Sequence, residues 1–375
     1  MTVTAPTRAP AATGRAGGPD PPAPAPSTAL RTATALGALA LLCVGLLLAT
    51  VAFGSVRLPL PAVLGALTGG TEPGTEATIV QQVRLPRALT ALLAGAALGA
   101  GGLQMQTLFR NPLADPFILG ISAGASLGVA LVVLAGGTGT ALLAAGLGLR
   151  GGAVVAAAAA AGALTVTVFV LAVARRVESP ATVLIIGLMV GYAVTAVVNV
   201  LVQGGIGELE RLRAFVAWGF GSFAGTSWND LVILGLTVAA GLLLAAGMTK
   251  SLNALLLGDA YAASMGVRVR LVRILVVVSA SLLAGGVTAF CGPVAFIGVA
   301  SPHLARGVLR SSDHRVLLPA TMLVGASVAL AAGLLAQLPG SDATLPLNSV
   351  TALVGAPVVI AVLLRLRRSA RAVTT

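Results

Sequence analysis

Long apolar runs with almost no charge recur along the whole chain, and they limit what it can fold into more than any other feature. About 20 apolar residues in a helix cross a ~30 Å hydrocarbon core. Because no water reaches the backbone inside lipid, such runs are expected to be helices, whose backbone groups bond to one another. Over 375 residues the chain is 57% hydrophobic and 9% charged, with a mean hydropathy of +1.01. These values exclude an ordinary soluble domain and predict an all-α polytopic membrane protein.

The apolar runs predict ten membrane spans. The eighth contains Pro302, and Ser301 before it is typical of an N-cap followed by a first-turn proline, so a helix is expected to restart there. A broken or half-length helix is tolerated only inside a bundle or beside a cavity. The predicted spans are 32–53, 88–108, 117–135, 153–174, 183–203, 231–248, 274–291, 293–310, 316–337 and 345–364.

The spans also set the domain organisation and the orientation. Residues 1–29 are rich in Ala, Pro, Thr and Gly and are predicted to be a disordered cytosolic tail. Residues 30–366 form the predicted ten-helix transmembrane domain, and residues 367–375 a cytosolic C-terminal tail. With the N-terminus inside, most of the 23 Lys and Arg residues lie on the cytosolic side, as the positive-inside rule requires. Both termini are therefore predicted to be cytosolic.

The second and third spans combine small residues with polar ones. Residues 95–99 and 120–128 carry glycines one helical turn apart, which favours inner helices that pack closely. The second span also holds Gln104 and Gln106, and polar groups at that depth face protein or water. These two side chains either line a pathway or form hydrogen bonds from helix to helix, and the spacing leaves both alternatives open.

Several kinds of chemistry are disfavoured by what the sequence holds. Cys43 and Cys291 both lie in apolar segments, and there are only two histidines, so neither a disulfide nor a metal framework is indicated. The net charge of +12 comes from basic residues between apolar runs, which is not the pattern of a nucleic-acid surface. No span centre carries a carboxylate, which disfavours an ion-coupled secondary transporter, and no filter sequence indicates a channel. No cluster of a nucleophile, acid or metal ligands indicates an enzyme.

The chain also lacks a site for nucleotide. A phosphate-binding loop needs a lysine after glycine, and the one lysine, Lys250, follows Thr249. Any coupling to ATP therefore requires a separate subunit on the cytosolic side. The inner loop 254–267 is the predicted dock, with Gly258 and Gly266 expected to bracket a short surface helix.

Seven motifs, in order between about residues 32 and 364, resemble the FecCD-type permeases of ABC importers. These permeases carry ferric siderophores, haem or vitamin B12, and the resemblance implies the ten-helix fold of the vitamin B12 importer permease, a type II ABC importer fold. The motifs are RLPR (84–87), Q-x3-RNPLADP (106–116), LG…GA (119–125), LG…MGV (257–267), FIG (296–298), PHxxR (302–306) and GAP (355–357).

The resemblance implies roles for particular residues. Arg84 and Arg87 would meet acidic residues of an extracytoplasmic binding protein; the alternative is that they snorkel at a helix end. An inner gate would involve Asn111 and Leu113 together with the loop around Ser179 and Thr182, and Gln104 and Gln106 are candidates for the translocation path from their depth in the second span alone. Coupling to the ATPase would involve Gly258, Asp259, Ala260, Ala263, Met265, Gly266 and Val267. A cytosolic-side structural role, rather than catalysis, is expected for Pro302, His303 and Arg306.

The expected partners follow from the same resemblance. They are a second permease chain, two cytosolic ABC ATPases that bind ATP and Mg, an extracytoplasmic binding protein and the lipid bilayer, with no cofactor or metal in this chain and no nucleic acid. Gln337 stands where a third docking arginine is frequent, and Thr344 and Asn348 where many members have Glu and Gly. The second permease chain could therefore be identical or a related FecCD-type chain. The expected cargo is an iron(III)-siderophore complex, with vitamin B12 or haem as alternatives, and the expected location is the cytoplasmic membrane.

Overall fold

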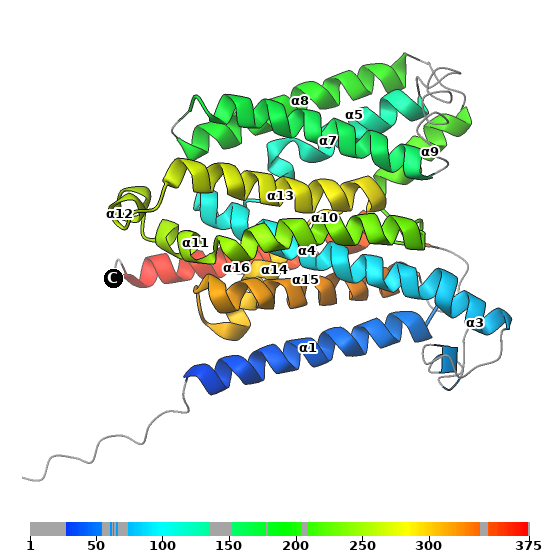
Figure 1. Cartoon of the computed structure of the whole chain (residues 1–375), viewed down its shortest axis with the longest axis horizontal. Helices are drawn as coiled ribbons and strands as arrows, with labels where there is room; N and C mark the ends of the chain where they lie inside the picture. Colours follow the sequence, from blue (N-terminus) through cyan, green and yellow to red (C-terminus); the bar gives the residue numbers. More distant parts are fainter. Residues whose placement is uncertain are drawn as a thin grey trace, which may run out of the picture.

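The computed structural model describes residues 28–54, 61, 63, 65–66, 74–134, 152–177, 179–204, 209–337 and 344–373. Within these ranges all regular structure is helical, which confirms the all-α prediction. Most of the long helices run side by side along one axis (Figure 1). The elements are α1 (Thr28–Ala52), α3 (Thr75–Ile79), η1 (Val80–Arg84), α4 (Leu85–Phe109), η2 (Pro116–Leu119), α5 (Ile121–Val133), α7 (Gly152–Ala174), α8 (Pro180–Gln203), α9 (Leu209–Gly219), α10 (Trp228–Gly247), α11 (Thr249–Leu256), α12 (Asp259–Ser264), α13 (Val269–Cys291), α14 (Ile297–Leu309), α15 (His314–Ala336) and α16 (Leu347–Val373).

Each of the ten predicted spans coincides with a helix: α1, α4, α5, α7, α8, α10, α13, α14, α15 and α16. In the part of the chain that the structure describes, 7 helices are long and apolar enough to cross a membrane. The predicted first tail lies outside the described residues, apart from its last two, which begin α1. Within the predicted C-terminal tail, α16 continues as a helix to Val373.

α14 corrects the prediction made at Pro302. The helix does not restart there: it begins at Ile297, after Phe296 in the left-handed region (φ 68°), and runs through the proline. Ser301 does not cap a helix, because its hydroxyl donates to the Ile297 carbonyl within the same helix, at 2.7 Å. At 13 residues α14 is about 20 Å long, so it is the half-length helix that the sequence allowed.

Pro302 has a packing consequence instead. Proline has no N–H to bond the carbonyl four residues earlier, which belongs to Gly298. That carbonyl faces Gly102 of α4, where an added Cβ would lie 1.8 Å from the oxygen. Only glycine at position 102 allows α4 and α14 to approach this closely.

The glycine rows confirm the prediction that α4 and α5 are inner helices. A Cβ at Gly95 would lie 2.2 Å from the Gly325 carbonyl oxygen of α15, and one at Gly128 would lie 2.0 Å from the Ala158 oxygen of α7. Backbone therefore packs directly on backbone at both places. α4 is the centre of the bundle, with α10, α13, α14 and α15 packed around it, and 83% of its most apolar 18 residues are buried.

Candidate functional site

A short helix at one end of the molecule has the form predicted for an ATPase dock. α12 is flanked by Gly258 (φ 114°) and Gly266 (φ 83°), which confirms that these glycines bracket a helix. It protrudes beyond the ends of the long helices, at the end of the bundle where α1 begins and α16 ends (Figure 1). Ala262 is fully buried and anchors it.

The outer face of this helix is apolar and open. Of the predicted coupling residues, Ala260, Ala263, Met265 and Gly266 are exposed, whereas Gly258, Asp259 and Val267 are half-buried. Exposed apolar side chains that gather on a protruding turn are typical of an interaction surface. Two of them, Leu257 (64% exposed) and Tyr261 (54%), were not predicted as coupling residues, although both lie in the loop 254–267.

Asp259 joins this helix to two others. Its Oδ1 accepts a hydrogen bond from the Arg110 guanidinium at 2.9 Å, and its Oδ2 accepts one from Arg273. Arg110 is the left-handed residue (φ 47°) that ends α4, and Arg273 lies in the second turn of α13. A single carboxylate thus ties α12 to the end of the central helix.

The segment that follows Arg110 is held by local hydrogen bonds. The Asn111 side-chain oxygen accepts from the Leu113 N–H at 3.0 Å, and the Asp115 Oδ1 accepts from the Phe117 N–H at 2.8 Å. From α14, the His303 Nε2 donates to the Pro112 carbonyl at 2.7 Å. Residues 111–113, two of which were predicted gate residues, are therefore positioned between Arg110 and a contact from α14.

Asp115 is the one carboxylate of this segment, and it is only 7% exposed. Burial raises its pKa to about 6, because the charged form loses water, while the hydrogen bond from the Phe117 N–H acts in the opposite direction. It lies between α4 and α5, as the N-cap of η2.

The side chains of the two glutamines of α4 are buried in the core and do not line an open path. The Gln106 oxygen accepts from the Arg306 guanidinium at 2.7 Å, and its nitrogen donates to the Val299 carbonyl at 3.2 Å. Gln104 is fully buried, and its Oε1 has no hydrogen-bond partner among the described residues. For Gln106 this favours the helix-to-helix alternative, and the burial of both argues against a path lining.

A different helix presents polar groups to the outside of the chain. Only 17% of the most apolar 18 residues of α8 are buried, and its exposed residues include Tyr192, Thr195 and Asn199. Spacings of three and four place them on one helical face. Polar side chains within a membrane span face protein or water, so this stripe marks α8 as the better candidate for a path lining. The predicted gate residues Ser179 and Thr182 are exposed at its beginning.

The two arginines of the RLPR motif have unlike surroundings. Arg84 is 6% exposed, and its Nη1 donates to the Val51 and Ala52 carbonyls at 3.0 and 2.7 Å. These are the last carbonyls of α1, which have no partner within their own helix. Arg84 therefore caps the C-terminal end of α1, and its docking role stays a prediction. Arg87 is half-buried and lines a cavity of about 260 Å³.

Comparison with known proteins decides the family. The model of the FecCD transport family matches residues 41–365. The chain belongs to the FecCD family. It is 38% identical over 288 residues to the vitamin B12 import system permease protein BtuC of Klebsiella pneumoniae, covering 77% of this chain and 83% of the relative. The protein of that name from Escherichia coli O9:H4 is 36% identical over 289 residues, with 77% and 84% covered.

A solved structure gives the same fold for this FecCD chain. It is described as an inward-facing conformation of a metal-chelate type ABC transporter, with a TM-score of 0.76, 28% sequence identity, and 89% of this chain and 99% of that chain covered. Together these comparisons establish an ABC importer permease of the FecCD and BtuC type with several membrane spans.

Two positions at which this FecCD chain departs from the common pattern have structural partners. The Gln337 amide faces the Arg87 guanidinium and, with its oxygen turned toward it, accepts from Nη2 at 2.9 Å. Asn348 donates to the Gly219 carbonyl at 3.2 Å and accepts from the Ala295 N–H at 2.9 Å. Asn348 thereby joins the start of α16 to the end of α9 and to the segment between α13 and α14. Among the described residues, no three His, Cys, Asp or Glu side chains form a group that would hold a metal.

Proposed function

We propose that this permease translocates an iron(III)-siderophore complex across the cytoplasmic membrane, with both termini in the cytosol. The support for this cargo is the likeness of 89% of the chain to a metal-chelate type transporter. Vitamin B12 is the second candidate, because the curated relatives carry that name. The pore would form between this chain and a second permease, identical or of the FecCD type.

The energy would come from two cytosolic ATPases that bind ATP and Mg. The observation that carries this is α12 with its flanking residues: the exposed Leu257, Tyr261 and Met265 offer an apolar contact, while Asp259 joins α12 to Arg110. A movement of α12 would reach residues 111–113 through this ion pair, since they follow Arg110 directly. No hydrolysis is assigned to the permease itself.

The outer face would receive the binding protein. Arg87 supplies a positive charge in the cavity of about 260 Å³ that it lines, and charges at such a rim steer and orient docking more than they add affinity. The exposed polar stripe of α8 would line the path below it. Residues 111–113 and the start of α8 would narrow the path on the cytosolic side.

Uptake by the reconstituted importer tests the proposal. Proteoliposomes would contain both permease chains and the ATPases, with the partner binding protein outside, and would receive either a ferric siderophore or vitamin B12. We expect ATP-dependent accumulation of the siderophore complex. Accumulation of vitamin B12 alone would transfer the assignment to the second candidate. Uptake that persists with a hydrolysis-deficient ATPase would instead indicate a secondary transporter.

A further inference from the structure

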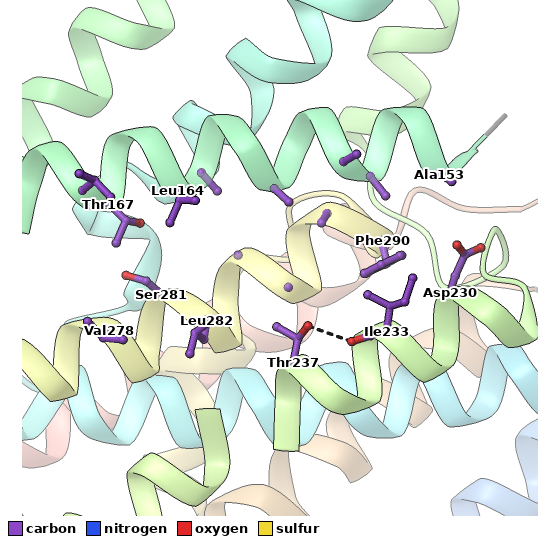
Figure 2. Close-up of a pocket in the computed structure, with 18 of the residues that line it drawn as sticks. Ala153, Leu164, Thr167, Asp230, Ile233, Thr237, Val278, Ser281, Leu282 and Phe290 are labelled. Carbon is purple, nitrogen blue, oxygen red and sulfur yellow. Dashed lines mark hydrogen bonds between the residues drawn. The ribbon is translucent and has the colours of Figure 1, made fainter. Parts of the chain in front are cut away.

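An apolar cavity of about 550 Å³ lies between α7 and α10, with α13 as its floor (Figure 2). α7 and α10 each pack on α13. The space between them stays open because small residues line it, among them Ala157 and Ala160 on α7 and Gly285 and Gly286 on α13. Its size is within the ~300–1,000 Å³ of small-molecule sites. We call this cavity the α7–α10 groove.

The depth of the groove corresponds to one leaflet of a bilayer. Along α13 its lining extends from Phe290, near the outer end of the helix, to Val278. Twelve residues of helix span about 18 Å, slightly more than half of a ~30 Å hydrocarbon core. A single extended acyl chain of the outer leaflet has this reach.

A second, more polar cavity of about 270 Å³ adjoins the groove at its outer end. The two share Ala156, Asp230, Ala289 and Phe290 as lining residues. The outer cavity is closed on one side by α9, through Trp218, whose indole nitrogen is buried. The two cavities together are apolar along the membrane depth and polar at the interface.

Both cavities have a buried polar atom in their walls that lacks a partner. Only three buried side-chain N or O atoms of the described residues have no hydrogen bond, and two of them are Trp218 Nε1, in the outer cavity, and Ser281 Oγ, in the groove.

Asp230 is the one charged residue that lines either cavity within the described part of the chain. Its Oδ2 accepts from the Ser227 N–H and hydroxyl, in the capping box that starts α10, and these bonds do not involve Oδ1. The carboxylate lies at the outer end of the groove (Figure 2). It attracts a cation at the depth where lipid headgroups begin.

We propose that the α7–α10 groove and its outer cavity hold one outer-leaflet phospholipid with an amine-bearing headgroup. An acyl chain fills the groove, the headgroup occupies the more polar cavity at its outer end, and the ammonium group pairs with Asp230. Burying a chain in protein instead of lipid brings no hydrophobic gain, so the polar end decides which lipid is held. A second permease copy has a different candidate face, the polar stripe of α8.

Photo-crosslinking tests the groove. The intact importer is reconstituted with a phosphatidylethanolamine that carries a photoactivatable acyl chain, irradiated and mapped by peptide mass spectrometry. We expect the crosslinked lipid on α7, α10 and α13. In Ala160→Phe, whose larger side chain fills the groove, the amount of crosslinked lipid should fall by about fivefold or more. The control is Ala161→Phe, an exposed position on the same helix that does not line the groove. The proposal would be overturned if α1 were labelled as strongly as α7, α10 and α13, or if Ala160→Phe were labelled like the unaltered protein. It would also be overturned by crosslinks between two permease copies across the groove.

The headgroup is tested without filling the groove. We compare phosphatidylethanolamine and phosphatidylglycerol probes that carry the same photoactivatable chain. The unaltered protein should be labelled about threefold more by the amine lipid. Asp230→Asn should be labelled equally by the two probes. Ser227→Ala removes the same cap and keeps the carboxylate, so it should retain the preference. Equal labelling by the two probes in the unaltered protein, or loss of the preference in Ser227→Ala as well, would contradict the role of Asp230.

Discussion

The helices α4 and α8 are both apolar membrane helices with polar side chains, and they use those side chains in opposite ways. In α4, 83% of the most apolar 18 residues are buried, against 17% in α8. The polar groups of α4 hold neighbouring helices, as Gln106 does with Arg306, whereas Tyr192 and Asn199 of α8 point out of the chain. Polarity within a span therefore indicates a path only where the helix has an uncovered face.

The largest expected effect is on the close packing of α4. Gly102→Ala places a Cβ 1.8 Å from the Gly298 carbonyl oxygen, which is backbone and cannot turn aside. We expect a loss of about 3 kcal/mol or more in the free energy of unfolding, at the upper end for overpacked sites. Thermal unfolding in detergent measures it. Gly45→Ala on α1, where nothing lies within 4 Å of the new Cβ, is the control. Equal stability of the two variants would show that α4 is not tightly enclosed.

Gln106→Leu should have the next largest effect on stability. The substitution leaves the half-buried Arg306 guanidinium without its acceptor on α4, and hydrogen bonds to charged groups contribute about 1.5–3 kcal/mol. We expect a loss of about 2 kcal/mol, measured by denaturant or thermal unfolding. Gln106→Glu keeps an acceptor for Arg306 and should lose less. If Gln106→Leu unfolds like the unaltered protein but no longer transports, the path interpretation of Gln106 would be restored.

On α8 the same kind of substitution should affect transport and leave stability unchanged. Asn199→Leu removes an exposed polar group, and surface substitutions alter the free energy of unfolding by about 0.5 kcal/mol or less. We expect uptake in proteoliposomes to fall while unfolding stays as before. Val200→Leu, an exposed apolar neighbour on the helix, serves as the control. Destabilisation by Asn199→Leu would mean that α8 is covered by protein along its stripe.

The comparison extends to the end of the bundle that carries α12, where α4 is tied to α12 and α8 has no such tie among the described residues. Asp259→Ala removes both ion pairs, which are partly exposed and contribute little to stability. Transport per ATP hydrolysed should nevertheless fall by about fivefold, since linkages of this kind change coupling by ~0.5–2 kcal/mol. The measurement is uptake and phosphate release from the same vesicles. Lys250→Ala, an exposed charge on α11, should change neither. If the ratio of uptake to phosphate release is unaltered in Asp259→Ala, the ion pairs of Asp259 do not contribute to coupling.

The sequence predicted the features that depend on residues within one segment, and it did not predict those that depend on contacts between distant segments. Helix positions and close-packed glycines were predictable, because apolar length and four-residue spacing lie within one segment. The roles of Arg84 and Gln106 were not, since their partners are 33 and 200 residues away. At Pro302 a local rule gave the wrong start, because α14 begins five residues earlier, after Phe296 in the left-handed region. The stripe on α8 was readable from its spacing, but its exposure depends on which helices cover it.

The smallest expected effect concerns the segment that joins α4 to α5. Burial raises the pKa of Asp115 from 3.8 to about 6. A pKa raised by folding means that the folded state binds the proton more tightly, so this stabilisation is complete below pH 3.8 and is lost as the pH rises through 6. The melting temperature in detergent should therefore fall by about 2 °C between pH 5 and pH 7.5. Asp115→Asn keeps an oxygen that accepts from the Phe117 N–H, but it cannot ionise. Its melting temperature should therefore lack this fall between pH 5 and pH 7.5. If both proteins show the same fall, another group is responsible, and the Asp115 carboxylate is better hydrated than its 7% exposure indicates.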